Sequence, residues 1–350
     1  MSAQLEISVE GHLGVIALNR PEAINALSHG MIAGIAEALR GWQTDERVRA
    51  VLFEGRGARG FCSGGDVRAA RAQVVEGRLA EAEAYFATEY AMNLLIATYG
   101  KPVLAIADGI VMGGGIGIAG HARFRFTTPD AKFAMPEAGI GFFGDVGVNA
   151  ILAKAPPHRA LLFLMSGKPV GAADALALGL ADCAVLAERI GELRSGLVAA
   201  ASTGDLEPAI VALMQSLSIQ AGERSLCALA DTLSDELKLE TAAEIVAAVD
   251  GKSAGNPEVA AIAALLKSRS PTSLEVIVQS HRAARRLPGI AEVLALDLRM
   301  ARLMAALPDF AEGVRAVLVD KDQAPVWAKQ VPAAAIRAAV AEKAVRTEAV

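Results

Sequence analysis

The chain has 350 residues, of which 53% are hydrophobic and 21% charged, and its mean hydropathy is +0.38. This length allows one large domain or two, and this composition excludes intrinsic disorder and a small disulfide-stapled fold. The formal net charge of −5, without runs of Lys or Arg, argues against a nucleic-acid groove and a polybasic membrane patch, so the expected partners are small molecules or proteins.

Up to about residue 190, runs that predict strands alternate with helical patterns. The strand-like runs lie at residues 5–9, 15–18, 50–53, 103–107 and 123–127. Ser28 is a suitable N-cap for the helix that follows the second run. The apolar stripe of that helix consists of Met31, Ile35, Leu39 and Trp42.

A second helical stretch covers about residues 70–98, and from about residue 190 onward helical patterns take over. These later helices are interrupted at residues 251–256 and at Ser270-Pro271. We therefore expect an α/β fold with a helical C-terminal region. The expected division is a core at residues 1–200 and a helical region at residues 201–350 that packs on the core.

The cysteines and histidines indicate neither disulfides nor a metal site. Cys62, Cys183 and Cys227 are odd in number and far apart, which is typical of a reducing compartment. The five histidines form no HxH or HExxH pattern, so we expect no metal. The first residues lack a leader pattern, and the most apolar run, residues 102–120, contains Asp108 and six glycines. We therefore expect a cytoplasmic protein without a membrane span.

Two glycine clusters follow predicted strands. Gly60–Val67 has the sequence GFCSGGDV, and Gly109–Gly117 has the sequence GIVMGGGIG. Glycine allows positive φ angles and close backbone approach, so N–H groups in such loops can point at a ligand atom. The two loops can therefore form a two-donor oxyanion hole, which a helix beginning at Gly114 would strengthen. The alternative is that both are only tight turns between a strand and a helix.

A third segment, residues 133–147, contains two carboxylates among aromatic and aliphatic residues. Carboxylates are rarely buried without a partner, so an acid in such surroundings is either a helix cap or a working group with a raised pKa. Asp145 suits an N-cap for a helix over residues 146–154, but a working acid is the favoured interpretation. Glu137, which follows Pro136, has no comparable structural explanation.

Two other chemical interpretations are open but weaker. Residues Gly115–Gly120 match GxGxxG, a dinucleotide-binding pattern, but a loop at residues 108–112 separates the preceding strand from these glycines. Cys62 could act as a nucleophile with His121 as its base. A buried, inert thiol is the favoured interpretation of Cys62.

Four sequence blocks, in order along the chain, resemble the signature of the crotonase (enoyl-CoA hydratase/isomerase) superfamily. The blocks are NRP with NAL at residues 19–27, GFCSGGDV at 60–67, KP with GIVMGGGIGIAGH at 101–121, and FAMPEAGIGFFGD at 133–145. The resemblance covers about residues 5–190. It implies a crotonase-like spiral of ββα units that binds an acyl-CoA thioester.

The same resemblance implies roles for particular residues. It implies an oxyanion hole made by the N–H groups of Gly65 and Gly114, and a CoA adenine held beside the backbone near Ser63 and Asp66. It implies that the reaction needs no metal or redox cofactor. CoA enters as part of the substrate. It leaves a homo-oligomer open.

Within the superfamily, the acids favour a hydrolase. Hydratases of this type use two glutamates, because adding water across a double bond requires a base and an acid together. Glu137 is present here, but the position of the other glutamate holds Gly117. The features that resemble the 3-hydroxyisobutyryl-CoA hydrolase branch, and that extend the match to nearly the whole chain, are Glu89, Asp145, residues 270–273 and residues 309–322.

That branch implies hydrolysis of a 3-hydroxyacyl-CoA thioester in valine catabolism. It implies that Glu137 attacks the thioester, directly or through a water, and that Asp145 and Glu89 bind the 3-hydroxyl group. The branch usually has proline where Gly144 stands. Two alternatives stay open: a hydratase or double-bond isomerase, in which Glu137 moves a proton at the α-carbon, and a non-catalytic acyl-CoA-binding protein.

Overall fold

The computed structural model describes residues 4–341, which form two compact units interleaved along the chain. Unit 1 contains the chain up to Asp66, Thr88–Ala134 and Lys168–Ala228. Unit 2 contains Val67–Ala87, Met135–Gly167 and the chain from Leu229 onward. This division by packing does not test the expected boundary between residues 200 and 201, which stays a prediction.

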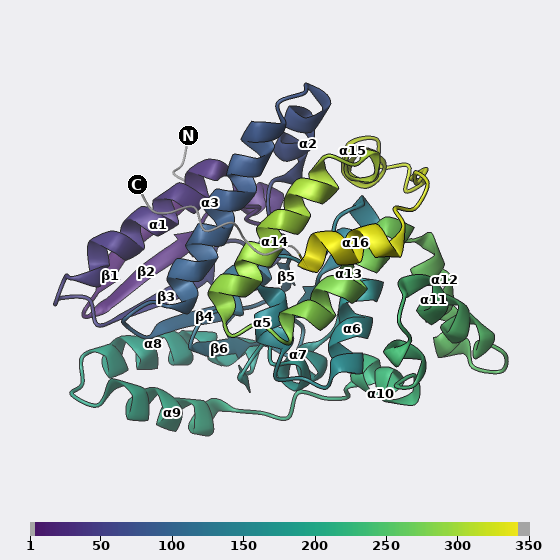
Figure 1. The fold of residues 1–350 in the computed structure, drawn as a ribbon. Coiled ribbons are helices and arrows are strands. Elements are labelled where there is room, and N and C mark those ends of the chain that lie inside the picture. The colour runs from purple at the N-terminus through teal and green to yellow at the C-terminus, as the bar shows by residue number, and fades with distance from the viewer. Residues whose placement is uncertain (1–3, 342–350) are drawn as a thin grey trace. The chain divides into compact units, whose positions relative to one another are not determined.

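A six-stranded sheet organises unit 1 (Figure 1). Its strands, in spatial order, are β1 (Leu5–Glu10), β2 (Leu13–Leu18), β3 (Ala50–Gly55), β4 (Val103–Ala107), β6 (Phe124–Thr127) and β8 (Cys183–Ala184). β1 and β2 are antiparallel, and the other neighbours are parallel. A separate parallel pair consists of β5 (Ile110–Met112) and β7 (Lys132–Ala134). The strands predicted from sequence are confirmed, whereas β5, β7 and β8 are too short to give a periodic signal.

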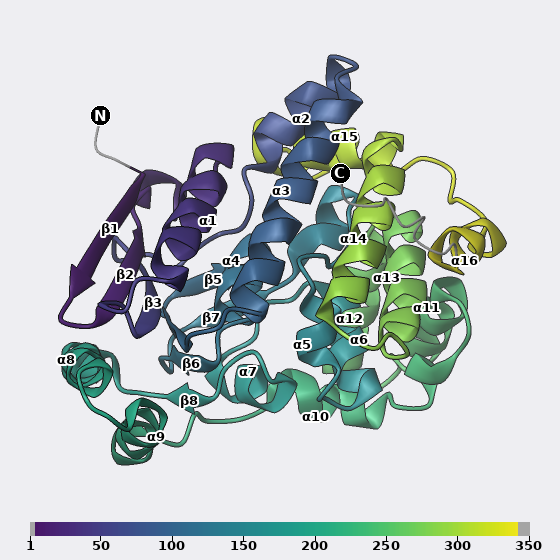
Figure 2. The ribbon, with the colours of Figure 1, turned by 60° about the vertical axis from the view of Figure 1, so that its left-hand side comes forward.

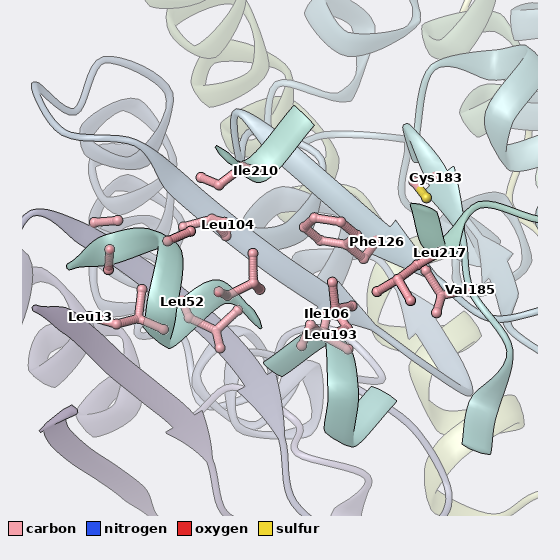
Figure 3. Packing of buried hydrophobic residues seen from close by; sticks show 14 of the residues in the cluster. Leu13, Leu52, Leu104, Ile106, Phe126, Cys183, Val185, Leu193, Ile210 and Leu217 are labelled. Carbon is pink, nitrogen blue, oxygen red and sulfur yellow. The ribbon is translucent and has the colours of Figure 1, made fainter. Parts of the chain in front are cut away.

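A hydrophobic core of unit 1 lies between one face of the sheet and the helices α8 (Ile190–Ala201) and α9 (Leu206–Leu217) (Figure 2). Alternate residues of a strand point to the same face, so Leu13 and Val15 of β2 both join this core. Leu193 of α8 and Ile210 of α9 pack against it (Figure 3). Burial of each such side chain contributes about 1.5–3 kcal/mol.

The helix α1 (His29–Gln43) begins where the sequence predicts. The side chain of Ser28 accepts a hydrogen bond from the N–H of Met31 at 3.2 Å, as an N-cap does. Trp42, at the end of the predicted stripe, covers Gly14 of β2, where a Cβ would lie 2.8 Å from the indole ring.

Other helices of unit 1 are α4 (Gly114–Ala119) and α7 (Ala172–Leu178), while α3 (Leu79–Ala97) and α10 (Ser225–Thr232) contain residues of both units. The single helical stretch predicted over residues 70–98 is two helices, α2 (Val67–Val75) and α3. The φ angle of Gly77 between them is +76°, a left-handed conformation that ends the first helix.

Unit 2 consists mainly of helices, including the long buried helix α13 (Pro271–Ala284). Its other helices include α2, α5 (Val148–Leu152), α6 (Pro157–Ser166), a 3₁₀ helix at Glu236–Lys238, α11 (Ala242–Gly251), α12 (Pro257–Ser268), α14 (Ile290–Ala305), α15 (Pro308–Val314), a π-helix at Arg315–Val319 and α16 (Ala333–Ala341). The predicted interruptions are confirmed, since Asn256 caps α12 and Ser270 caps α13. Within residues 4–341, no helix is both long and apolar enough to cross a membrane.

Within unit 2, segments from the C-terminal part of the chain enclose η2 (Pro136–Ile140), a short 3₁₀ helix. A Cβ at Gly139 would lie 2.6 Å from Nη1 of Arg269, and a Cβ at Gly141 would overlap the carbonyl group of Asp309. A Cβ at Gly313 of α15 would overlap the backbone carbonyl group of Ile140. Glycine on both sides therefore allows α15 to pack directly on η2.

We expect Gly313→Ala to lower the stability of the protein, because the added Cβ would meet backbone atoms of Ile140, which cannot move aside as a flexible side chain can. Overpacking of this kind costs about 1–3 kcal/mol. Gly251→Ala is the matched control, since nothing lies within 4 Å of its Cβ position. Thermal unfolding of both variants measures the effect. An unchanged melting temperature for Gly313→Ala would contradict the close packing of α15 on η2.

Candidate active site

In unit 1, the loop that follows β3 and the loop that follows β4 run side by side. The N–H of Cys62 donates to the carbonyl of Ile110 (3.0 Å), and the N–H of Met112 donates to the carbonyl of Cys62 (2.9 Å). Next to these hydrogen bonds, Gly60 and Gly109 form an isolated antiparallel β-bridge. Their φ angles are +157° and +62°. A Cβ at either glycine would overlap the backbone of the other loop. The glycines are therefore required for the approach of the two loops, whatever the loops bind.

This approach brings the backbone N–H groups of Gly65 and Gly114 together. Gly114 is the first residue of α4, so its N–H has no acceptor within the helix. The amide nitrogen of Gly65 lies 3.3 Å from the position that a Cβ of Gly114 would take. Among the described residues of this loop, the N–H groups of Ser63 and Asp66 donate to backbone carbonyls, whereas that of Gly65 has no backbone acceptor. The geometry suits a two-donor oxyanion hole, a role that stays a prediction.

The carboxyl group of Glu89 lies against the same glycines. Glu89 is on α3 and is 3% exposed, and a Cβ at Gly114 would overlap its Oε1 atom. The structure thus brings an acid to Gly114 from α3, although Gly117 of α4 carries no side chain. Sequence reasoning selected Glu89 only through the family resemblance, and no local pattern indicates this proximity.

The thiol of Cys62 is buried between the two loops. Its Sγ atom lies 3.2 Å from the carbonyl oxygen of Asn25. Burial, followed by the charge of Glu89, raises the pKa of Cys62 to about 12, and a backbone hydrogen bond from Gly64 only partly offsets this shift. The thiolate is therefore scarce near neutral pH, which disfavours Cys62 as a nucleophile and agrees with an inert thiol.

Ser63 and Asp66, which are predicted to lie near the CoA adenine, are held by the segment before α1. Ser63 Oγ donates to the carbonyl of Ala23 (3.0 Å), and Arg20 Nη1 forms an ion pair with Asp66 Oδ2 (2.8 Å). The buried side chain of Asn25 donates to three backbone carbonyls of the glycine loop. These contacts fix the shape of the loop, and contact with an adenine stays a prediction.

Unit 2 holds Glu137 and Asp145, both largely buried. Glu137 is 9% exposed and lies in the first turn of η2, where Pro136 sets the start of the helix. Asp145 is 5% exposed and lies in the segment between η2 and α5. Acids this buried require strong polar partners or a shifted pKa, as expected from the sequence.

The interpretation of Asp145 as the N-cap of a helix over residues 146–154 is wrong. The helix α5 begins at Val148 and is capped by Gly147 without any side-chain hydrogen bond. Val146 and Gly147 have φ angles of +53° and +73°. Two consecutive left-handed residues cannot continue a right-handed helix, so the helix starts later than the sequence predicts.

Sequence reasoning did not identify Asp297 of α14, which binds this turn. Asp297 is fully buried, and its Oδ2 accepts a hydrogen bond from the N–H of Gly147 at 2.8 Å. Burial, and next the charge of Asp145, raise the pKa of Asp297 well above its ordinary value. The sequence does carry a signal, because Asp297 lies on the apolar stripe of α14 that includes Met300 and Met304.

Gly144, where the resembling branch usually has proline, packs against Leu164 of α6. A Cβ at Gly144 would lie 2.7 Å from Leu164 Cδ2, so a larger residue at this position requires Leu164 to move. Glycine at position 144 and the buried leucine are therefore complementary in size.

The GxGxxG pattern at Gly115–Gly120 does not form a dinucleotide-binding turn. Such a turn joins a strand to the start of a helix, whereas these residues lie within α4 and at its C-cap. A Cβ at Gly115 would lie 2.7 Å from the carbonyl oxygen of Cys62, so this glycine serves close packing. In the described part of the chain, no group of three or more His, Cys, Asp or Glu side chains is placed to hold a metal ion.

Comparisons with known sequences place these features in a family context. The family model for enoyl-CoA hydratase/isomerase matches residues 13–343. The mitochondrial 3-hydroxyisobutyryl-CoA hydrolase of Danio rerio is 36% identical over 324 residues, which cover 91% of this chain and 83% of that protein. The 3-hydroxyisobutyryl-CoA hydrolase 1 of Arabidopsis thaliana is 33% identical over 334 residues, covering 93% of this chain and 88% of that protein.

Two solved structures are similar over nearly the whole chain. A carnitinyl-CoA dehydratase from Mycobacterium thermoresistibile has a TM-score of 0.88 and 35% identity, with 98% of each chain covered. An enoyl-CoA hydratase from Rhodobacter sphaeroides 2.4.1 has a TM-score of 0.86 and 33% identity, with 97% of each chain covered. The expected crotonase-like α/β fold is confirmed.

Cys62 should resist alkylation in the folded protein. With a pKa of about 12, the thiolate is only about 10⁻⁴ of the population near pH 8, and the side chain is fully buried. Treatment with iodoacetamide, followed by mass spectrometry of the peptide that contains Cys62, should show labelling only after unfolding in urea. Rapid, complete labelling of Cys62 in the native protein would return it to the candidate nucleophiles.

Proposed function

The chain belongs to the enoyl-CoA hydratase/isomerase family, and from this premise we propose that it hydrolyses 3-hydroxyisobutyryl-CoA to 3-hydroxyisobutyrate and CoA. The observation that carries the proposal is the adjacent pair of N–H groups at Gly65 and Gly114, with glycine at position 117 where a hydratase needs a second acid. The names of the Danio rerio and Arabidopsis thaliana relatives, which match over about nine tenths of this chain, support the substrate.

The thioester carbonyl oxygen gains negative charge when its carbon is attacked. In the proposed mechanism, the N–H groups of Gly65 and Gly114 donate to this oxygen and are already in place before the reaction. Loss of one such donor costs about 10²–10³ in rate in known cases.

Glu137 is proposed to drive the attack, and two routes are open to it. As a nucleophile, its carboxylate oxygen bonds to the carbonyl carbon, the C–S electron pair leaves on the CoA sulfur, and water hydrolyses the resulting anhydride. As a general base, Glu137 takes a proton from a water that attacks the same carbon, the C–S electron pair leaves on the CoA sulfur, and the sulfur takes up a proton. Hydroxylamine trapping distinguishes the routes, because only the anhydride converts Glu137 into a hydroxamate that mass spectrometry detects.

Asp145 and Glu89 are proposed to accept hydrogen bonds from the 3-hydroxyl group. A substrate without this hydroxyl would leave a buried acceptor unpaired, and the free-energy cost of the unpaired acceptor disfavours that substrate. The CoA moiety is proposed to lie near Ser63 and Asp66, and the reaction requires no metal or redox cofactor. A role in valine catabolism and a cytoplasmic location are parts of the same proposal.

A hydratase is the second candidate, favoured by the position of Glu89 beside Gly114 and by the structural similarity to a carnitinyl-CoA dehydratase and an enoyl-CoA hydratase. A thiol-release assay with 3-hydroxyisobutyryl-CoA separates the candidates, because a hydratase leaves the thioester intact. The parallel assay follows loss of the enoyl absorbance of crotonyl-CoA. Hydration of crotonyl-CoA without thiol release from 3-hydroxyisobutyryl-CoA would overturn the hydrolase proposal.

Glu137→Gln should lower kcat for thiol release by about 10²–10⁴-fold, because the amide can neither attack the carbonyl nor take a proton. Ligand affinity should change little, since the side chain keeps its shape. Glu275→Gln is the matched control: Glu275 is also a buried acid of unit 2, but it accepts from the N–H of Ala242 and from Gln279. The Glu275→Gln variant should be less stable than wild type and should have an unchanged kcat. Turnover of Glu137→Gln within about tenfold of wild type would remove Glu137 from the mechanism.

Asp145→Ala should reduce kcat/KM for 3-hydroxyisobutyryl-CoA much more than for isobutyryl-CoA. Only the first substrate loses a hydrogen bond to a charged group, worth about 1.5–3 kcal/mol. Asp174→Ala is the control, since Asp174 is a buried acid that accepts from the N–H groups of Leu226 and Cys227 at the start of α10. The control should lower the melting temperature and affect both substrates equally. Equal losses for Asp145→Ala would contradict its role in recognising the hydroxyl group.

A further inference from the structure

The turn from Asp145 to Gly147 in unit 2 holds Val146 in a backbone conformation that valine does not favour. Val146 is buried and has a φ angle of +53°, although a β-branched residue rarely adopts the left-handed region. Gly147 continues the turn at +73°. Strain of this kind persists only where the surrounding structure enforces it, and it is concentrated at functional sites.

Hydrogen bonds within the turn and to α14 fix its conformation. The N–H of Val148 donates to the carbonyl of Asp145 at 3.0 Å, which closes the turn locally. The N–H of Gly147 donates to Oδ2 of Asp297 at 2.8 Å, which ties the turn to α14, a helix that packs against α5. Asp297 therefore holds the backbone only two residues after Asp145.

The surroundings of Asp297 indicate which of the two acids, Asp145 or Asp297, keeps a proton. Asp297 is fully buried, and its Oδ1 has no hydrogen-bond partner among residues 4–341. The charged groups that act on it are Asp145, which disfavours its ionisation, and Arg299, whose smaller effect is opposite. Two interacting acids in a dry environment avoid double ionisation, so the more buried acid, Asp297, keeps the proton.

We propose that Asp297 is a positioning residue, which as a neutral carboxyl group fixes the turn through the Gly147 N–H and so holds Asp145 in place to meet the substrate. The inference rests on the proposed function, in which Asp145 binds the 3-hydroxyl group. It adds a residue from a distant part of the chain to the determinants of acyl selectivity.

Two substitutions of Asp297 test this role. In Asp297→Asn the carbonyl oxygen can still accept from Gly147 N–H, and the group is neutral like a protonated acid. Its kcat/KM for 3-hydroxyisobutyryl-CoA should stay within about threefold of wild type. Asp297→Leu removes the acceptor, so kcat/KM for this substrate should fall by about tenfold or more while that for isobutyryl-CoA falls much less.

Met304→Ala is the matched control, because Met304 is a buried residue two turns later on the same face of α14. It should lower the melting temperature without changing the ratio of kcat/KM for the two thioesters. An unchanged ratio in Asp297→Leu would overturn the inference. A loss of more than about tenfold in Asp297→Asn would also overturn it, even if the leucine variant does not fold.

A measurement without substrate separates this inference from the proposed function. An acid whose pKa is raised by folding binds more protons in the folded state, so its contribution lowers stability as pH rises above the ordinary aspartate range. The melting temperature of Asp297→Asn should therefore increase relative to wild type as pH rises. A difference that is constant or decreases with pH would overturn the neutral state of Asp297. Absence of thiol release by the wild type would instead overturn the proposed function.

Discussion

The two glycine loops of unit 1 approach each other at a distance that leaves no room for side chains. A Cβ at Gly60, Gly109 or Gly115 would meet backbone atoms of the facing loop. Every backbone group at such a contact must find a partner, and most do so across the loops. The N–H groups at the end of this contact are therefore held rigidly before any ligand arrives, which is the condition for electrostatic stabilisation of a developing charge. The same contact buries Cys62 and keeps its thiol protonated.

Buried acids elsewhere in the molecule show what a structural role looks like. Asp174 and Glu275 each accept from backbone N–H groups at the start of a helix, which satisfies donors that the helix itself cannot pair. Asp297 also accepts from a backbone N–H, but it does so at a strained turn and beside a second carboxylate. A helix cap requires neither a strained turn nor a second carboxylate. The surroundings of Asp297 therefore distinguish it from the capping acids Asp174 and Glu275.

The sequence predicted those elements whose formation depends on residues close together in the chain. Apolar alternation identified the longer strands, and the predicted cap at Ser28 and the predicted break at Ser270-Pro271 depend on residues within three positions. Sequence reasoning failed where backbone geometry overrides the pattern: Gly77 divides one predicted helix, and the left-handed Val146 delays the start of another. Asp297 was missed because its partner, Gly147, is far away in the sequence, and no periodicity records such a contact. Glu137 and Asp145 stood out by their apolar surroundings, whereas Glu89 was selected only from the family resemblance. Spacing alone did not distinguish a working carboxylate from a cap at Asp145.

The placement of acids near Gly114 bears on the reaction proposed for this chain. In this chain the carboxylate next to Gly114 comes from α3, as Glu89, and position 117 within α4 is glycine. Under the proposed function, an acyl group bound beside Gly114 therefore meets a carboxylate from α3 and none from position 117. Adding water to a double bond requires an acid and a base at the two carbons, whereas hydrolysis of a thioester requires attack at one carbon beside a stabilised oxyanion. Under the proposed function, the N–H groups of Gly65 and Gly114 stabilise the oxyanion, and glycine at position 117 leaves the attack to Glu137.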